Sequence, residues 1–408
     1  MQSIETVIQK TTLDTKRDIP NRLVIRATVD YLNVIQKRNP YFRTERVFIP
    51  RRTLTNPRAP SKNHGFDNIN DDYILRVKEV LGDVVRYEIL DLMGQGTFGQ
   101  VVKCKTQKTG EFVAIKVIKK QHAYQMQSLK EIQVLNRLKS RPEHKHRFLQ
   151  LHNSFMFRGH VCAVFELLSI SIHKLFSQQT ERPRMSIRGI QKVASNVLET
   201  LALLKEMRII HTDLKPDNIL LKSSDDIHDV KLIDYGSAFF ETDPLNYCIQ
   251  TAFYRSPEVI LRHPFGCAVD MWSFGCFVAE LFLGKPLFPT GHELALLHMM
   301  VATLNRLPPE HMLKSKKAHH YFHLKQPISL RPLRDMPKRQ SLEEQIIKAD
   351  TTATLQERKS LIDFLVHILV FDPIQRYTPK QALNHAFLAG TIGIPPTKPL
   401  KSILKTKQ

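Results

Sequence analysis

The sequence has few cysteines, and their positions do not suggest a cross-linking or metal-binding set. The five are odd in number, widely separated and without a Cys-x-x-Cys spacing: Cys104, Cys162, Cys248, Cys267 and Cys276. Such a pattern argues against a disulfide framework and against a zinc site. A reducing compartment is therefore expected.

Long hydrophobic runs are also missing. The longest apolar stretch, near residues 271–283, is shorter than the roughly 20 residues that a helix needs to cross a bilayer. The first segment, MQSIETVIQKTTLDTKRD, lacks the apolar core of a signal peptide. We therefore expect a soluble, intracellular protein with no membrane partner.

Acidic residues are too few to balance the basic ones. Sixty Lys and Arg against 39 Asp and Glu give a net charge of +21, which attracts phosphate-rich or acidic partners. However, no Cys/His zinc pattern or aromatic ribonucleoprotein signature is present, and the basic residues are dispersed. Nucleic acid is thus not expected as a primary partner.

The chain changes character at Tyr87. Residues 1–86 form a polar, basic extension with many turn-forming residues in RRTLTNPRAPSKNHGFDNINDD. The segments YEILDLMG, QVVKCK and FVAIKVIKK then follow, short and β-branched, as antiparallel strands require. A main domain is predicted at 87–387, with a surface insert at about 308–355 and a basic tail at 388–408.

Helical patterns follow the strands. Leu129, Ile132, Leu135 and Leu138 recur at helical spacing and predict one apolar stripe. The segment QKVASNVLETLALLKEM predicts a longer amphipathic helix, and DMWSFGCFVAELFLG is apolar nearly all round, which is typical of a buried helix. Strands followed by helices predict an α+β fold with a small β-rich lobe and a larger helical lobe.

Three glycines lie in a segment between two predicted strands. Gly94, Gly96 and Gly99 occur in GQGTFGQV, where a tight hairpin can bring backbone amides close to phosphates. A similar glycine spacing marks dinucleotide-binding folds, but that fingerprint opens a helix, whereas VVKCK is typical of a strand. Without further motifs, a plain glycine hairpin would be an equally good interpretation.

A lysine on a predicted strand and a glutamate on the next predicted helix follow the glycine-rich segment. Lys116 is in the strand segment VAIK, where it can pair with α- and β-phosphate oxygens, and Glu131 on the next helix can hold it. A lone exposed Lys–Glu pair is usually only a surface contact. The motifs further along the chain therefore decide the interpretation.

The segment HTDLKPDN supplies three polar groups suited to phosphoryl transfer. Asp213 can accept the proton of a substrate hydroxyl, Lys215 can neutralise γ-phosphate charge, and Asn218 can bind a metal ion. Asp234, in Asp-Tyr-Gly after VKLID, adds an acidic Mg²⁺ ligand, and Ser-Pro-Glu at 256–258 follows. Five motifs in this order form the protein kinase signature, so ATP and Mg²⁺ are the expected cofactors.

These motifs, with further segments, resemble the DYRK family of dual-specificity kinases, specifically its Yak branch. The resemblance covers about residues 29–387 and includes LTNPRAPSKNHGFDNINDDYILRVKEVL, FELLSISIHKLF and FYRSPEVIL. The first of these blocks is the most specific, because kinases at large lack it. A second resemblance, to Clk-type kinases, appears in HTDLKPDN and LPPEHMLKSKKAHHYF but does not cover that block.

The resemblance implies roles for individual residues. Phe165 would be the gatekeeper and 166–168 the hinge that contacts adenine, while Asp213 would be the base assisted by Lys215. Glu258 would pair with Arg376, and Asp270 would bond to the catalytic-loop backbone. The residues expected to bind ATP are Met93, Gly94, Gln95, Gly96, Thr97, Phe98, Gly99, Gln100, Val101, Lys116, Glu131, Phe165, Glu166 and Leu168, and those expected to bind metal are Asn218 and Asp234.

Four positions depart from the pattern. Thr212 replaces the arginine usual in other kinases, and Tyr235 replaces phenylalanine, which adds a hydroxyl that needs a partner. Cys248 stands where the family has its autophosphorylated tyrosine, and Ala252 stands where the family has an arginine that pairs with the phosphate. We therefore expect activity without phosphotyrosine at 248; a phosphosite shifted to Tyr247 is the alternative.

The resulting hypothesis is a signalling kinase that phosphorylates Ser/Thr of protein substrates and, by the resemblance, tyrosine in its own chain. The alternatives are a pseudokinase scaffold, which has no need for intact metal ligands and base, and a Clk-like kinase. The family implies acceptor sites with nearby Arg and a following Pro, although Ala252 alters that pocket. Polybasic segments and the resemblance imply cytoplasm and nucleus.

Overall fold

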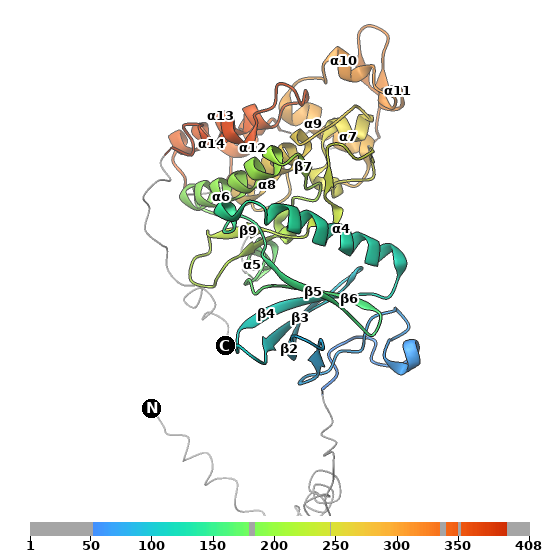
Figure 1. Ribbon diagram of the computed structural model, residues 1–408. Coiled ribbons are helices and arrows are strands. Elements are labelled where there is room, and N and C mark those ends of the chain that lie inside the picture. Colours follow the sequence, from blue (N-terminus) through green and yellow to red (C-terminus); the bar gives the residue numbers. More distant parts are fainter. Residues whose placement is uncertain (1–51, 179–183, 245, 335–339, 350–351, 390–408) are drawn as a thin grey trace, which may run out of the picture. The chain divides into compact units, whose positions relative to one another are not determined.

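The computed structural model describes residues 52–178, 184–244, 246–334, 340–349 and 352–389. Among these, residues from Thr53 onward form a small lobe built on a β-sheet and a larger lobe of helices (Figure 1). The order of strands and helices confirms the expected α+β, two-lobed kinase fold.

The small lobe contains one six-stranded antiparallel sheet in the order β1-β2-β3-β4-β6-β5. Its strands are β1 (Val80–Leu81), β2 (Tyr87–Gln95), β3 (Gly99–Thr106), β4 (Phe112–Ile118), β5 (Leu151–Phe157) and β6 (His160–Glu166). Burial alternates along β3, so one face packs into a core while the other meets solvent. The three strands predicted from the sequence correspond to β2, β3 and β4.

Helix α4 (His122–Leu138) lies between the sheet and the large lobe (Figure 1). Its buried side includes Ile132, Val134, Leu135 and Leu138. Leu129, predicted to belong to the apolar stripe, is instead 48% exposed. That prediction was wrong because the helix turns Ser128 and Glu131 inward, toward the ion pair described below.

The large lobe is mainly helical. Its helices are α5 (Ile172–Ser177), α6 (Ile187–Glu206), α7 (Pro257–Leu261), α8 (Ala268–Leu283), α9 (Glu293–Leu304), α10 (Glu310–Leu313), α11 (Ala318–Tyr321), α12 (Leu342–Ile347), α13 (Leu355–Ile368) and α14 (Pro379–Leu383). Short antiparallel pairs join β7 (Ile209–Ile210) to β10 (Phe239–Phe240), β8 (Ile219–Leu221) to β9 (Val230–Leu232), and β11 (Phe322–His323) to β12 (Ser329–Leu330).

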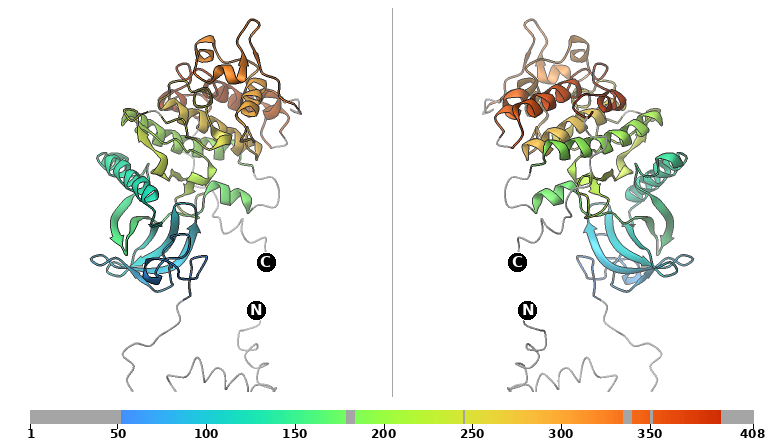
Figure 2. Two further views of the ribbon diagram at one scale, coloured as in Figure 1. Left: turned by 90° about the vertical axis from the view of Figure 1, so that its right-hand side faces the viewer. Right: turned by 90° about the vertical axis from the view of Figure 1, so that its left-hand side faces the viewer.

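Helix α8 forms the centre of the large lobe, and Figure 2 shows neighbouring helices around it. Every residue from Val269 to Leu283 is buried, as expected for a helix that is apolar nearly all round. Helix α6 contacts α8, and Val193, Val197 and Leu201 of α6 are buried, which confirms the predicted amphipathic helix. In the described part of the chain, no helix combines the length and apolarity needed to cross a membrane.

Residues 53–86, here called the amino-terminal block, pack on the small lobe at the end remote from the large lobe (Figures 1 and 2). Tyr73 is buried in the core of the sheet. Asp67 and His160, both buried, lie 2.9 Å apart, and the other ring nitrogen of His160 lies 2.7 Å from the carbonyl oxygen of Ile118. Residues 1–51 of the predicted extension lie outside the described residues.

The insert beginning near residue 308 is less superficial than predicted. Met312, Leu313, Ala318 and Phe322 are buried in the main core, although Lys and His residues surround them in the sequence. Composition suggested a surface segment, but these apolar residues of the insert pack into the core of the large lobe. Residues 335–339, 350–351 and 390–408, which include most of the predicted tail, lie outside the described residues.

Candidate active site

The glycine-rich segment, residues 93–101, forms the hairpin between β2 and β3. Gly99 has a φ of 151°, and a Cβ atom there would lie 2.2 Å from the carbonyl oxygen of Val117. A side chain at this position would displace the backbone of β4. By contrast, nothing would lie within 4 Å of a Cβ at Gly94 or Gly96. The tip is thus open, and its backbone amides can approach phosphate oxygens.

The side chains of this hairpin point in different directions. Met93 and Val101 line the cavity described below. Phe98 packs edge-on against Tyr124 of α4, with ring centroids 5.4 Å apart. Gln95 and Gln100 instead bond to the amino-terminal block, and the Thr97 side chain is exposed. Of the predicted ATP-binding residues in the hairpin, several therefore offer only backbone groups to a nucleotide.

Lys116 on β4 joins the two lobes. Its Nζ lies 2.8 Å from Oε2 of Glu131 on α4 and 3.3 Å from Oδ1 of Asp234. Burial alone would lower the pKa of Lys116, but the two carboxylates outweigh this and hold that pKa above its ordinary value. Lys116 is consequently a permanent cation, and α4 is held with Glu131 facing inward.

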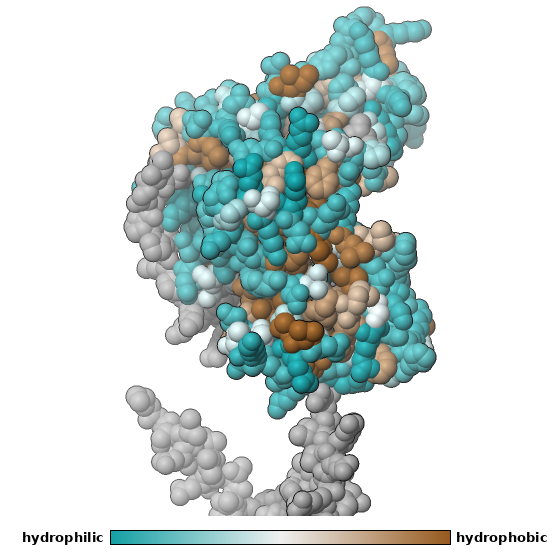
Figure 3. Space-filling model, in the orientation of Figure 1, coloured by the Kyte–Doolittle hydropathy of each residue, from teal (hydrophilic) through white to brown (hydrophobic). Residues whose placement is uncertain are grey.

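Behind this ion pair lies a cavity of about 210 Å³ between the lobes. Its lining comprises Met93, Val101, Ala114, Lys116, Glu131, Leu149, Phe165, Glu166, Leu168, Asn218, Leu220, Ile233 and Asp234. Apolar walls with a polar rear suit a flat heterocycle attached to a charged group. On one face of the molecule, hydrophilic residues predominate and hydrophobic ones gather at the level of α4 and the sheet (Figure 3).

The hinge begins at Glu166, the last residue of β6. Its Oε1 accepts hydrogen bonds from Nζ of Lys231 at 2.6 Å and from the N–H of Gln150 at 2.8 Å. Lys231 is buried, so this ion pair connects the hinge to β9 inside the large lobe. Because the Glu166 carboxylate is engaged by Lys231 and Gln150, the hinge presents mainly its backbone to the cavity.

Asp213 lies at the mouth of the cleft with donors on both carboxylate oxygens. Oδ2 accepts from Nζ of Lys215 at 2.8 Å and from Nδ2 of Asn218 at 3.0 Å. Oδ1 accepts from Oγ1 of Thr251 at 2.7 Å. Asn218 also donates to the Asp213 carbonyl oxygen, which closes the loop on itself. The carboxylate is therefore fixed in one orientation.

Two buried carboxylates support this loop. Asp270, at the start of α8, accepts the N–H groups of His211 and Thr212, each at 2.8 Å. Glu258 and Arg376 form a two-pronged ion pair with contacts of 2.7 and 3.0 Å, and both side chains are completely buried. These are the contacts that the family resemblance implied, and they join distant segments of the large lobe.

The two departures near the metal-binding turn have different consequences. Thr212 donates its hydroxyl to the carbonyl oxygen of Ser237 at 2.9 Å, so a short neutral bond replaces an arginine. The hydroxyl of Tyr235 is buried and has no hydrogen-bond partner among the described residues. The ring of Tyr235 packs edge-on against His211. The partner that we expected for this hydroxyl is thus not found.

The chain between Asp-Tyr-Gly and Ser-Pro-Glu, at 234–258, is here called the activation segment. Arg255 and the buried side chain of Gln250 hold its last part. Arg255 donates to the carbonyl oxygens of Ile249 and Gln250, at 3.2 and 3.1 Å, and lies 3.5 Å from Glu293. Gln250 has a φ of 62°, and its carboxamide oxygen accepts from the N–H and the hydroxyl of Ser256. Cys248 is exposed.

The expected metal ligands suit a hard cation. Asp234 offers a carboxylate and Asn218 a carboxamide oxygen, both at the rear of the cavity. Oxygen ligands of this type are preferred by Mg²⁺. Burial tends to raise the pKa of Asp234, but the charge of Lys116 outweighs it and lowers that pKa, so the carboxylate is ionised. The donor set therefore fits a divalent ion.

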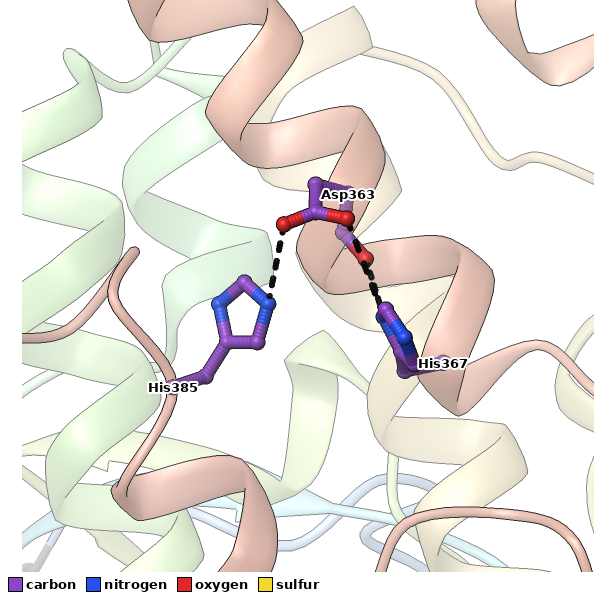
Figure 4. Close-up of side chains that lie close together, drawn as sticks. All are labelled: Asp363, His367 and His385. Atoms are coloured by element: carbon purple, nitrogen blue, oxygen red, sulfur yellow. Dashed lines mark hydrogen bonds and ion pairs between the residues drawn. The ribbon is translucent and has the colours of Figure 1, made fainter.

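A second group of candidate ligands lies on the large lobe, far along the chain from the cleft. Asp363 and His367 lie one turn apart on α13, and His385 faces them from beyond α14 (Figure 4). Nδ1 of His385 accepts the N–H of Phe387, which places the proton on Nε2, 3.3 Å from Asp363. Nδ1 of His367 donates to the Asp363 carbonyl oxygen. These contacts join α13 to the segment after α14, which is a structural role that needs no metal.

Several residues of the site were missed by the sequence analysis. Thr251 is bonded to Asp213 although 38 positions separate them. Ala114, Leu149 and Ile233 line the cavity but look like ordinary core residues in the sequence. No local signal distinguishes such residues, because their role depends on which segments meet in the fold.

Comparison with known proteins agrees with this geometry. A protein kinase domain model matches residues 87–388. The serine/threonine-protein kinase ppk15 of Schizosaccharomyces pombe is 40% identical over 385 residues, covering 86% of this chain and 71% of that protein. A dual specificity protein kinase YAK1 homolog of Arabidopsis thaliana is 37% identical over 413 residues, covering 90% of this chain and 43% of that protein.

The human dual specificity tyrosine-phosphorylation-regulated kinase 4 is 35% identical over 336 residues, covering 81% of this chain and 62% of that protein. The chain thus spans less than two thirds of this protein and of the Arabidopsis one. With the kinase motifs gathered around one cleft, and with these relatives, the chain belongs to the protein kinase family, among the Yak and DYRK kinases.

Proposed function

We propose that the chain transfers the γ-phosphate of ATP, in the presence of Mg²⁺, to serine and threonine hydroxyls of proteins. The observation that best supports this is the arrangement around Asp213, whose carboxylate is held by Lys215, Asn218 and Thr251 at the mouth of the cavity. A catalytic base must lie within reach of the proton that it accepts, and these three contacts fix the position of the Asp213 carboxylate. A scaffold would have no use for such an arrangement.

The residues have distinct roles in this mechanism. Lys116, held by Glu131, would bind the α- and β-phosphates, and the hairpin amides would cover them. Asn218 and Asp234 would hold Mg²⁺, which neutralises phosphate charge when bound. Asp213 would accept the hydroxyl proton, and Lys215 would stabilise charge on the transferred group. The protein thus contributes positioning and electrostatics, which dominate phosphoryl transfer.

The acceptor protein would approach through a groove of about 820 Å³ that begins at Asp213. Its lining includes Lys130 and Gln133 of α4 and residues 236–240 and 248–251. Because Thr251 touches the base, the residues that follow an acceptor hydroxyl would lie against 249–255. A groove of this volume beside the proposed base supports proteins as substrates.

A proline after the acceptor is the sequence preference that we infer. Gln250 adopts a left-handed conformation, and its carbonyl oxygen is already bonded to Arg255. A peptide N–H facing this carbonyl would therefore compete for an occupied acceptor, whereas proline has no N–H to satisfy. Since Arg255 makes the contact, the preference does not depend on the alanine at 252. A peptide library with and without proline after the acceptor tests this.

The proposed activity is tested with Asp213→Asn and, as matched control, Asp225→Asn, an exposed aspartate of the same lobe. Wild type and control should phosphorylate a basic protein substrate with ATP and Mg²⁺. Asp213→Asn should lower turnover by on the order of 10²–10⁴ while ATP binding, measured with a fluorescent analogue, changes little. Near-normal turnover of Asp213→Asn would contradict the assignment, and an inactive wild type would favour the scaffold.

The location of the protein remains a proposal that rests on charge and resemblance. We propose cytoplasm and nucleus, and the net charge of +21 with its polybasic segments supports this. Microscopy of the tagged chain tests it, and exclusion from the nucleus would contradict it.

A further inference from the structure

The side chain of Gln95, the last residue of β2, bonds to the amino-terminal block. Its Nε2 donates to the carbonyl oxygen of Asn56 at 2.6 Å, and its Oε1 accepts the N–H of Asn56 at 3.1 Å. The same Nε2 lies 3.1 Å from Oδ2 of Asp72. The carboxamide thus pairs with the backbone of residue 56 much as a neighbouring strand would.

The opposite strand of the hairpin is tied to the same block. Gln100 is the register partner of Gln95 and is completely buried. Its Oε1 accepts the hydroxyl of Thr55 at 2.6 Å, and its Nε2 donates to the carbonyl oxygen of Tyr73 at 2.8 Å. Both strands are therefore anchored at the level where the glycine-rich tip begins.

The glycine-rich tip is held by backbone bonds and by the packing of Phe98 on Tyr124, while its first glycines are open to solvent. Gly94 and Gly96 have open space where side chains would be. The backbone contact from the N–H of Lys119 to the carbonyl oxygen of Phe98, at 3.1 Å, joins the tip to the end of β4. Glycine-rich backbone loses much conformational entropy when it is ordered, so anchors at its base reduce the cost of closing over phosphates.

The block also reaches the segment that leads into α4. The carbonyl oxygen of Asp71 accepts the N–H of Lys120 at 3.1 Å, and its Oδ2 accepts from Nε2 of Gln121 at 2.7 Å. Gln121 is the residue before the first turn of α4, the helix that presents Glu131 to Lys116. The amino-terminal block thus contacts both the glycine-rich hairpin and the start of α4.

We propose that Gln95 is a positioning residue for the nucleotide, whose bonds to Asn56 and Asp72 hold the glycine-rich hairpin ready to bind ATP. This rests on the proposed kinase function and deepens it, because it assigns to the amino-terminal block a part in nucleotide affinity. Gln95 acts through the hairpin, not by touching the reacting atoms.

The hydrogen bond from Gln95 to Asp72 depends on charge, because Asp72 is a buried carboxyl group. The carboxyl group is 1% exposed, and its Oδ1 has no hydrogen-bond partner among the described residues, while Nζ of Lys119 lies 4.0 Å away. Burial raises the pKa of Asp72, as expected for a carboxylate with few donors. A second carboxylate beside it would repel it and would also face the carbonyl oxygen of Asn56.

The test uses the full chain with Gln95→Glu, which keeps the shape of the side chain but removes both donated bonds. Direct ATP affinity should weaken and KM for ATP should rise by on the order of tenfold, with kcat within about twofold of wild type. Gln95→Ala, without the repulsion, should raise KM less. Adding Asp72→Asn to Gln95→Glu should restore most of the affinity, because an amide can donate to the new carboxylate. Gln107→Glu, an exposed glutamine in the turn between β3 and β4, is the matched control.

The outcomes separate the alternatives. Unchanged ATP affinity and KM in Gln95→Glu and Gln95→Ala would overturn the proposal. So would a fall in melting temperature and kcat at unchanged KM, since that is the mark of a merely structural contact. If wild type binds ATP but transfers no phosphate, the kinase function fails, yet direct binding to the same variants still decides the role of Gln95.

Discussion

Glu280 on α8 is a buried acid whose ionisation should make the stability of the large lobe depend on pH. Its side chain is 9% exposed, and Oε2 accepts the hydroxyl of Tyr254 at 2.6 Å. Burial raises the pKa of Glu280 to about 7, and this outweighs the bond from Tyr254 and the charge of His173, which act in the opposite direction. The folded protein therefore holds a proton here more tightly than the unfolded chain does.

The sign and size of the effect follow from this difference. In the unfolded chain the group ionises near its ordinary pKa of 4.5, whereas in the folded state it does so near 7. Its contribution to stability is complete below pH 4.5 and is lost as pH rises to about 7. The difference between the two values corresponds to about 3 kcal/mol of unfolding free energy.

The perturbation is Glu280→Gln, which keeps an oxygen to accept the Tyr254 hydroxyl but cannot ionise. Its free energy of unfolding should exceed that of wild type by up to about 3 kcal/mol at pH 8 and by much less at pH 5. Thermal and denaturant unfolding across this pH range measure the gap, and the exposed Glu143→Gln serves as control. Parallel stability curves for Glu280→Gln and wild type from pH 5 to 8 would refute the reasoning.

Three further predictions concern other parts of the chain. Glu258→Gln leaves the completely buried Arg376 without a charged partner and should cost about 3–5 kcal/mol in denaturant unfolding; a loss below about 1 kcal/mol would contradict it. Bacterially expressed protein should be active without phosphate on Tyr247, and Tyr247→Phe should keep that activity, since Arg255 already bonds to the segment backbone; stoichiometric phosphate with an inactive variant would sink this idea. Deleting residues 1–80 should lower the melting temperature and soluble yield, and an equally stable truncated protein would instead make the block a linker or partner site.

The strands and the long helices could be predicted because their signal is local. Alternation in β3 and the apolar character of α8 are visible within about 16 residues of sequence. The orientation of Leu129 and the burial of Met312 and Phe322 could not be predicted in this way. Local hydrophobicity shows which residues favour burial, but whether they are buried depends on the segments that pack against them.

In the cleft too, some residues were predictable from local sequence and others depended on the fold. Lys116, Asp213 and Asp234 were predictable, because phosphoryl transfer needs these residue types in a recognisable order. The contact from Thr251 to Asp213 was not, since the two residues meet only when the activation segment folds back over the loop. The motifs therefore predicted the groups that we propose to react, but not the residues that orient them.

The sequence by itself determined the chemistry that we propose for this protein: which side chains would hold phosphates, bind a cation and accept a proton. Tertiary structure alone decided how those groups are held, as when Gln95 and Gln100 turn to the amino-terminal block or when Tyr235 buries a hydroxyl without a partner. Reactive groups are properties of single residues and short motifs. Their support is a property of long-range packing, in which residues far apart in the chain are brought within hydrogen-bond distance.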